Sequence, residues 1–134
     1  MGEGLVRTVI AYLDTQVIVW LCQKRLEKLP SAAIAAIEES ELLISPMVLV
    51  ELQYLYELKR IVQPAQALVR QLESQIGLLI CDHPFPAVAQ AALFEKWTRD
   101  PFDRMIVAHA KSNAYSQLVT SDGKIRENCS NAIW

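Results

Sequence analysis

Four acidic residues, far apart in the sequence, occupy positions that suit metal-dependent chemistry. They are Asp14, Glu51, Asp103 and Asp122. Asp14 and Asp122 each end a short apolar run, whereas Glu51 and Asp103 lie early in apolar helical stretches. Carboxylate oxygens are the ligands that Mg²⁺ and Mn²⁺ prefer, and these ions activate water and stabilise charge in phosphoryl chemistry. The pattern therefore favours a phosphodiester hydrolase, provided that the fold brings the acids together.

Glu51 is the most informative of the four acids. At about 3.6 residues per turn, Gln53, Glu57 and Arg60 form the polar side of its helical segment, and Glu51 points to roughly the opposite side. Its neighbours three and four residues away are apolar or aromatic. Asp103 shares a face with apolar residues in the same way. A carboxylate on an apolar face is unfavourable unless it is paired or bound to a metal, so both acids point to a buried site.

Each acid also has a purely structural interpretation. Asp14 and Asp100 are placed to cap helices, Asp122 lies in a Ser-Asp-Gly turn, and Asp103 could be the third-position partner of Asp100 in a capping arrangement. Asp100 is more often a cap than a ligand. What favours a functional site is the coincidence, because three or four inward carboxylates at one place would repel one another strongly without a cation.

The elements that must position these acids follow from apolar runs and capping signals. Short apolar runs predict buried strands at residues 9–13, 42–44, 77–81 and 118–120, and an edge strand at 132–134. Helical patterns predict helices at residues 15–22, 31–40, 46–60, 64–74, 86–97 and 101–113, with a short turn at 124–128. Ser45-Pro46 and Asp100-Pro101 are typical helix starts, a cap followed by proline.

Strands that alternate with helices predict an α/β fold with three layers, α/β/α. Its central sheet is expected to be mainly parallel, with four to five strands covered by helices on both faces. A length of 134 residues without a linker predicts a single domain over residues 1–134. In such sheets the functional crevice lies beyond the carboxyl ends of the strands, which is where the acids fall.

Composition narrows the classes of function. Hydrophobic residues make up 52% of the chain and charged residues 21%, which argues against disorder. No apolar run reaches the length of a membrane span, and residues 1–8 lack the apolar core of a signal peptide, so we expect a cytoplasmic protein without membrane contact. The four glycines form no phosphate-binding loop, which argues against a nucleotide cofactor. Three widely spaced cysteines argue against a zinc site or a disulfide framework.

A net charge of −2 counts weakly against nucleic-acid binding, because proteins of that kind usually carry a basic surface. The whole-chain sum is a poor guide here, since acids clustered in a site would be neutralised by a bound cation. Arg99, Arg104 and Lys111 are candidates to guide a phosphate backbone, although solvated surface residues are the simpler interpretation. Tyr54 and Tyr56 are expected to be core or interface residues rather than platforms for base stacking.

Four sequence motifs occur in order along nearly the whole chain. They are Tyr12-Leu13-Asp14-Thr15, Ile44-Ser45-Pro46 through Val50-Glu51-Leu52, Arg99-Asp100-Pro101-Phe102-Asp103-Arg104-Met105-Ile106, and Leu118-Val119-Thr120-Ser121-Asp122. The third is the most specific. Together they resemble the PIN domain, and within it the VapC-like ribonuclease toxins of type II toxin–antitoxin systems. Residues 124–127 and 132–134 are similar to one subgroup of that family.

The resemblance implies a central parallel sheet, Mg²⁺- or Mn²⁺-dependent cleavage of RNA, frequent homodimers, and a cognate antitoxin protein that blocks the site. Asp14, Glu51, Asp103 and Asp122 would be the catalytic, metal-binding acids. Thr15 and Ser121 are lesser candidates for contacts to water or phosphate, and Asp100 is a further lesser candidate. Gln16 departs from the pattern, since members with this opening often carry histidine there, but it is not one of the four acids.

Two alternatives stay open. The first is a non-catalytic PIN-like module that acts through protein contacts, against which the intact acids argue. The second is a metal-dependent nuclease of single-stranded DNA, against which the small size and the lack of an added DNA-binding element argue. A haloacid-type phosphatase is less favoured, because the stretch around Asp14 lacks the second aspartate of that chemistry. The apolar helices at residues 46–58 and 64–74 are expected to supply a dimer or antitoxin surface.

Overall fold

The chain folds around a five-stranded, all-parallel sheet in the order β3-β2-β1-β4-β5. The computed structural model describes residues 9–134, so the expectations for residues 1–8, that they carry no signal peptide and belong to the domain, lie outside the described residues. The strands are β1 (Ile10–Leu13), β2 (Glu41–Ile44), β3 (Leu79–Ile80), β4 (Ser116–Val119) and β5 (Ala132–Ile133). The predicted α/β class with a mainly parallel sheet is confirmed.

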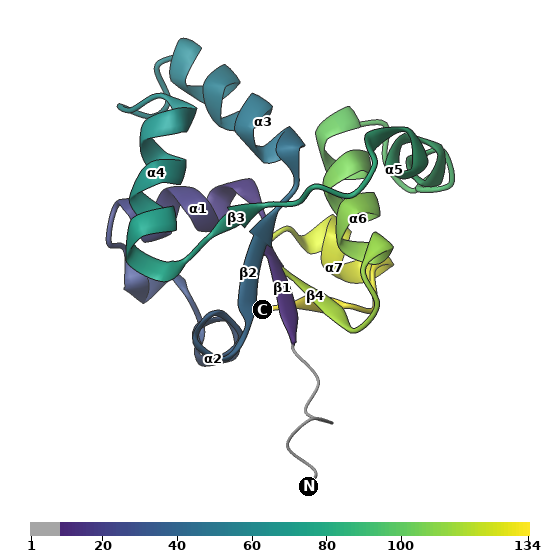
Figure 1. Ribbon diagram of the computed structural model, residues 1–134, viewed down its shortest axis with the longest axis horizontal. Helices are drawn as coiled ribbons and strands as arrows, with labels where there is room; N and C mark the ends of the chain where they lie inside the picture. Colours follow the sequence, from purple (N-terminus) through teal and green to yellow (C-terminus); the bar gives the residue numbers. More distant parts are fainter. Residues whose placement is uncertain (1–8) are drawn as a thin grey trace, which may run out of the picture.

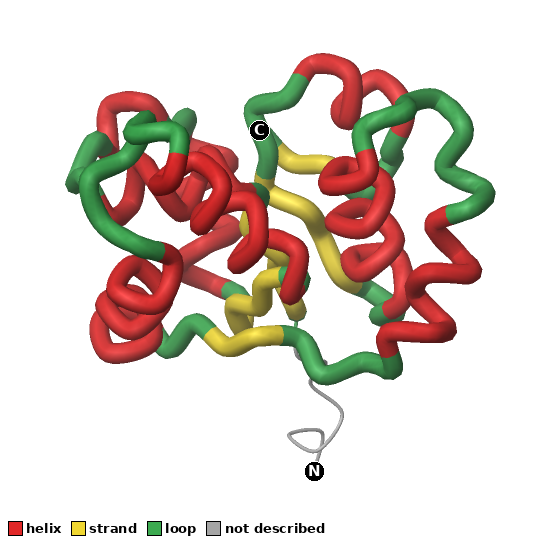
Figure 2. Tube along the Cα trace, turned by 90° about the horizontal axis from the view of Figure 1, so that it is seen from above, coloured by secondary structure: helices red, strands yellow, loops and turns green. Residues whose placement is uncertain are grey.

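Helices cover both faces of this sheet (Figures 1 and 2). They are α1 (Thr15–Cys22), α2 (Ser31–Glu39), α3 (Pro46–Glu57), α4 (Ala65–Ile76), α5 (Phe85–Ala92), α6 (Pro101–Ser112) and α7 (Gly123–Asn128), with a 3₁₀ helix η2 (Leu26–Lys28). In Figure 1, α1, α2 and α4 lie on one side of the sheet and α5, α6 and α7 on the other. Between residues 9 and 134, none of the helices combines the length and apolar character needed to cross a membrane.

The predicted capping signals set the starts of the helices. Ser45 Oγ accepts a hydrogen bond from the Met47 amide at 3.1 Å, and Asp100 Oδ1 accepts one from the Phe102 amide at 2.8 Å. Each cap satisfies an amide that would otherwise lack a partner in the first turn. Because the caps fix where α3 and α6 begin, they also fix which turn carries each of the two helical acids.

The third predicted strand is not buried, and this prediction was wrong. β3 has only two residues at the edge of the sheet, and the side chains of Leu79 and Ile80 are 59% and 42% exposed. Only the flanking Leu78 and Cys81 are buried. An apolar run predicts a strand but not its position in the sheet, which depends on how many strands pair beside it.

The helix predicted at residues 86–97 is shorter than expected, because α5 ends at Ala92. Residues Leu93 and Phe94 follow as an exposed turn, and the chain then folds back so that Glu95 contacts Lys111 of α6. α3 likewise ends at Glu57 rather than at residue 60. Lys59 adopts a left-handed φ of 62°, a conformation that terminates a helix.

The core lies between the sheet and its two helical layers, and Leu118 of β4 is fully buried in it. We expect Leu118→Ala to lower the free energy of unfolding by about 2–5 kcal/mol, because it removes apolar contacts and leaves a cavity. Leu93→Ala is the matched control: Leu93 is 64% exposed, and the expected change is below about 0.5 kcal/mol. Urea unfolding of both variants measures the difference, and equal losses would contradict this placement of Leu118.

Candidate active site

The order of the strands places the topological switch point of the sheet between β1 and β4. The chain leaves β1 for β2 and β3 on one side and returns to β4 and β5 on the other, so the two directions separate at the carboxyl ends of β1 and β4. Open α/β sheets bind their ligands at such a switch point. Asp14 directly follows β1, and its amide donates to the Val119 carbonyl at the end of β4, 3.1 Å away. Asp14 therefore lies at the switch point of the sheet.

The Asp14 carboxylate is buried and held on both of its oxygens. Oδ1 accepts from the Thr15 amide at 2.8 Å, and Oδ2 accepts from the Thr120 hydroxyl at 2.6 Å. The first bond caps α1, as the sequence predicted. The second joins the ends of two neighbouring strands. Asp14 thus caps a helix and also lies at the switch point, so its capping role is compatible with the functional role that the sequence suggested.

Thr15 brings Glu51 of α3 beside Asp14. The Thr15 hydroxyl donates to Glu51 Oε1, while its amide caps α1 through Asp14. Glu51 is half-buried, in agreement with its predicted position on the apolar side of its helix. This hydrogen bond spans 36 residues of sequence. Thr15, a lesser candidate at the outset, is the residue that connects the two acids.

Asp103 lies in the first turn of α6, half-buried, next to the exposed cap Asp100. Its backbone amide donates to Asp100 Oδ1 at 3.2 Å, but its carboxylate accepts no hydrogen bond from residues 9–134. The two acids therefore do not form a reciprocal capping pair. Asp122, after β4, caps α7 by accepting from the Ile125 amide at 2.9 Å. Ser121, half-buried beside Asp122, makes no side-chain hydrogen bond within the same range.

Electrostatic repulsion shows that the acids share one neighbourhood. Burial and, after it, the charges of Asp100, Asp14, Asp122 and Glu51 raise the pKa of Asp103 from 3.8 to about 7. Burial also raises the pKa values of Asp14 and Glu51, against the lowering effect of their hydrogen bonds to threonine. The five acids are therefore near enough to influence one another's ionisation.

This neighbourhood is not a closed coordination shell. In the described part of the chain, no three His, Cys, Asp or Glu side chains are grouped so that they could hold a metal ion together. Three of the four acids instead direct oxygens at protein donors: Asp14 uses both, and Glu51 and Asp122 use one each. The Asp103 carboxylate, by contrast, is half-buried and accepts no hydrogen bond there. The donor set consists of oxygens alone, which is the chemistry that Mg²⁺ and Mn²⁺ prefer.

Thr120 and His109, which the sequence did not assign to the site, make hydrogen bonds that hold its elements in place. Thr120 orients Asp14, as described above. His109 of α6 is fully buried, and its Nδ1 lies 2.8 Å from Ser45 Oγ at the start of α3. This contact ties together the two helices that carry Glu51 and Asp103. No sequence signal could have paired residues 64 positions apart.

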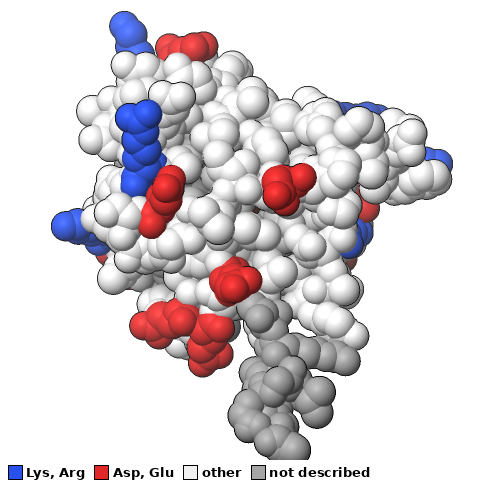
Figure 3. Space-filling model, viewed as in Figure 1, with Lys and Arg blue, Asp and Glu red and all other residues white. Residues whose placement is uncertain are grey.

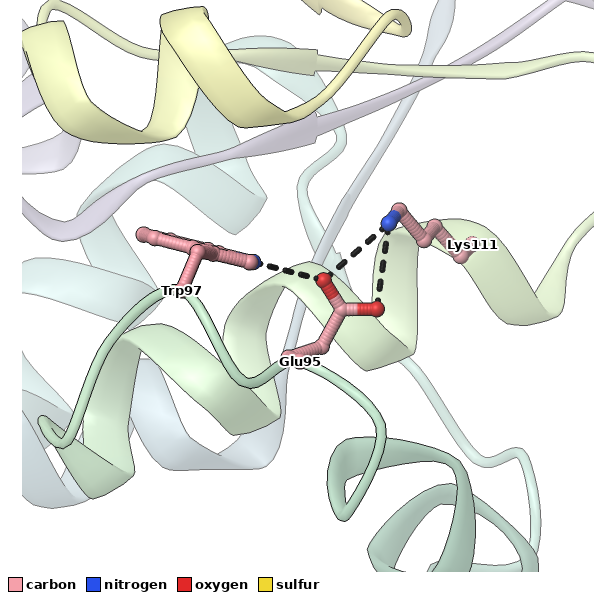
Figure 4. Close-up of polar contacts among 3 residues, drawn as sticks. All are labelled: Glu95, Trp97 and Lys111. Atoms are coloured by element: carbon pink, nitrogen blue, oxygen red, sulfur yellow. Dashed lines mark hydrogen bonds and ion pairs between the residues drawn. The ribbon is translucent and has the colours of Figure 1, made fainter.

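A second network anchors the segment that leads into α6 (Figure 4). Glu95 is buried, accepts from Trp97 Nε1 at 2.8 Å, and has both oxygens 3.0 Å from Lys111 Nζ. Arg104 Nε donates to the Thr98 carbonyl at 2.9 Å. Two of the basic residues considered as guides for a phosphate backbone are thus engaged in holding this segment in place.

We expect Glu95→Ala to lower the free energy of unfolding by about 1–3 kcal/mol, because a buried acceptor of charged and neutral hydrogen bonds is lost. The half-exposed Lys111 ammonium can return to water, which limits the loss. Glu95→Gln is the matched control, since its amide oxygen still accepts from Trp97. A urea titration should place this variant between wild type and alanine. A fully stable Glu95→Ala variant would show that the network is dispensable.

Basic side chains do not gather over the centre of the face shown in Figure 3. Lys and Arg lie toward the margins of that view, acidic groups lie nearer the middle and below, and most of the surface is uncharged. A phosphate backbone would therefore meet no cluster of basic side chains at the centre of this face.

Comparisons with known proteins agree with this architecture. No curated protein sequence matches the chain significantly. Three solved structures share its fold. A chain of VapBC2 from Rickettsia felis, bound to a DNA fragment from their promoter, matches with 21% identity and a TM-score of 0.58, over 88% of this chain and 92% of that one.

The other two structures are equally similar. A chain of DNA-bound VapBC from Salmonella typhimurium matches with 20% identity and a TM-score of 0.58, over 93% and 96% of the two chains. A chain of VapBC-1 from nontypeable Haemophilus influenzae matches with 19% identity and a TM-score of 0.59, over 92% and 94%. At this level of sequence identity, the three structures show that the fold is shared. The family model described as "PIN domain" matches residues 11–130, and the chain therefore belongs to the PIN domain family.

Proposed function

We propose that this protein is a metal-dependent endoribonuclease and the toxin of a toxin–antitoxin pair. The observation that carries the proposal is that Thr15 joins Asp14, at the switch point of a PIN-family sheet, to Glu51, with raised pKa values at these two acids and at Asp103. Partly buried carboxylates at one place are electrostatically unfavourable alone, and perturbed groups of this kind are characteristic of functional sites.

The four acids are the residues that would hold Mg²⁺ or Mn²⁺. When bound, such an ion supplies activation of water and stabilisation of charge on the phosphate and the leaving oxygen. Thr120 and the Thr15 amide keep the Asp14 carboxylate in one orientation, and the Thr15 hydroxyl does the same for Glu51. Water attacks phosphorus in line as the bond to the 3′ oxygen breaks. No protein nucleophile is required.

The toxin assignment rests on similarity of fold to chains from three VapBC structures, together with the PIN-family match. It implies a cognate antitoxin protein as partner, and a homodimer and a cytoplasmic location complete the proposal. The apolar surface of α3 supports a protein contact, since Val50, Tyr54 and Leu58 are each 46–52% exposed. Sedimentation that shows only a monomer would remove the dimer from the proposal.

The experiment is cleavage of a mixed RNA pool by the purified protein, with Mg²⁺, with Mn²⁺ and with EDTA. We expect cutting that requires the metal. Single-stranded DNA of matched sequence tests the alternative of a DNA nuclease. If DNA is cut in preference to RNA, DNA is the substrate. No cutting of either by a folded sample free of antitoxin, together with no detectable Mn²⁺ binding, would favour a non-catalytic interaction module.

A further inference from the structure

A groove flanks the acids and has no role in the proposed hydrolysis. Its volume is about 760 Å³, within the range of about 300–1,000 Å³ that is usual for small-ligand sites. Its walls come from α3, from the start of α4 and from the start of α6. Two of its lining residues are neighbours in sequence of the candidate acids. Tyr54 lies one turn after Glu51, and Phe102 directly precedes Asp103. The groove therefore lies beside the turns of α3 and α6 that carry Glu51 and Asp103.

Two aromatic rings form one wall of this groove. The rings of Tyr54 and Phe102 are stacked, with centroids 6.3 Å apart and planes inclined by 28°. Tyr54 is 51% exposed, so of the two roles predicted for it, core or interface, the core role is wrong, and a flat surface remains open to a ligand. Stacking on aromatic side chains is how proteins hold the unpaired bases of single-stranded RNA.

The polar groups of the groove are unsuited to binding a phosphate but can hydrogen-bond to a nucleobase. None of the lining residues is Lys or Arg, and Glu57 adds a carboxylate that repels the RNA backbone. Gln53 is engaged by the protein, since it accepts from the Ala65 amide at 3.2 Å and donates to Glu57 at 3.3 Å, which fixes α4 against α3. Gln66 is exposed on the rim, so its amide is available to a base edge.

We propose that this groove is a base-binding subsite, in which an unpaired nucleobase beside the scissile phosphate of RNA stacks on Tyr54. The inference rests on the proposed ribonuclease function. It assigns the groove a part in choosing the RNA sequence, because the base that fits there sets which phosphate meets the acids. The backbone passes over the acids, and the base turns into the groove.

The test compares Tyr54→Ala with Tyr54→Phe, which keeps the stacking ring, and with Tyr56→Ala, an exposed tyrosine of the same helix that does not line the groove. Cleavage of a randomised single-stranded RNA pool with Mn²⁺, followed by sequencing of the ends, gives the base preference at each flanking position. Removing one stacked base weakens binding by roughly 5- to 150-fold. For Tyr54→Ala we expect KM to rise within that range, with a smaller change in kcat and loss of preference at one position.

A second readout does not depend on cleavage. Fluorescence anisotropy of labelled single-stranded RNA 12-mers in EDTA should show weaker binding to Tyr54→Ala, and wild-type binding to Tyr54→Phe and Tyr56→Ala. Tyrosine-dependent RNA binding without any cleavage would support the subsite and overturn the nuclease. Metal-dependent cleavage with unchanged KM and preference in Tyr54→Ala would overturn the subsite and leave the nuclease. Loss of only a copurifying partner protein in that variant would show that the groove binds protein instead.

Discussion

Asp14→Asn is expected to reduce metal-dependent RNA cleavage by at least about 100-fold. The substitution removes the charge at the centre of the acid neighbourhood, and losses of about 10²–10³ are usual when a preorganised electrostatic group of a reaction centre is removed. The fold should survive, since the asparagine oxygen can still accept from the Thr15 amide and the Thr120 hydroxyl can reverse its bond. Initial rates on one RNA substrate in Mn²⁺ give the comparison.

The matched control for this prediction is Asp82→Asn, which removes an exposed carboxylate from the loop after β3. It should cleave RNA as wild type does. Thermal unfolding of both variants separates loss of chemistry from loss of fold. Full activity in a folded Asp14→Asn protein would refute the assignment of the acids, whatever the outcome for the base-binding groove.

Asp103→Asn is expected to stabilise the metal-free protein at pH 8 while leaving its stability near pH 4 unchanged. The pKa of Asp103 is about 7 in the folded state, against about 3.9 when unfolded. Between these values the folded state binds more protons, so wild-type stability falls as pH rises through this window. About 3 pKa units correspond to roughly 4 kcal/mol, and screening at this half-exposed site reduces the expected gain to about 1–2 kcal/mol.

Urea unfolding in EDTA at the two pH values measures this effect, with Asp82→Asn again as the control that should show no pH-dependent gain. Addition of Mn²⁺ should reverse the order of stability. Ligand binding to the folded state stabilises wild type by about 2.7 kcal/mol at 100 times Kd, whereas Asp103→Asn would lack one of the proposed metal ligands. If the free energies of unfolding of wild type and Asp103→Asn differed by the same amount at both pH values, the placement of Asp103 among the acids would be wrong.

These two predictions express one property of the site. The acids that would bind the ion are destabilising without it, because burial and mutual repulsion oppose their ionisation. Thr15, Thr120 and the buried contact between Ser45 and His109 hold the surrounding elements in place against that repulsion. We therefore expect the protein to be most stable when a divalent cation is bound.

Local structure was largely predictable from the sequence, because it depends on neighbouring residues. The cap-and-proline pairs at Ser45 and Asp100 predicted the starts of α3 and α6, and β1 and α1 were predicted within one residue. The inward position of Glu51 followed from helical periodicity alone. Parallel pairing followed from the alternation of strands and helices, since parallel strands need a crossover between them.

Tertiary structure decided what depends on residues distant in the chain. It placed β3 at the exposed edge of the sheet, ended α5 at Ala92 so that Glu95 could reach Lys111, and joined Thr15 to Glu51 and Thr120 to Asp14. It also turned Tyr54 to the surface beside Phe102. Sequence periodicity reports which side of an element is apolar, but not which element packs against it. The candidate acids could therefore be proposed from the sequence, whereas the side chains that hold them and the groove beside α3 were set by packing.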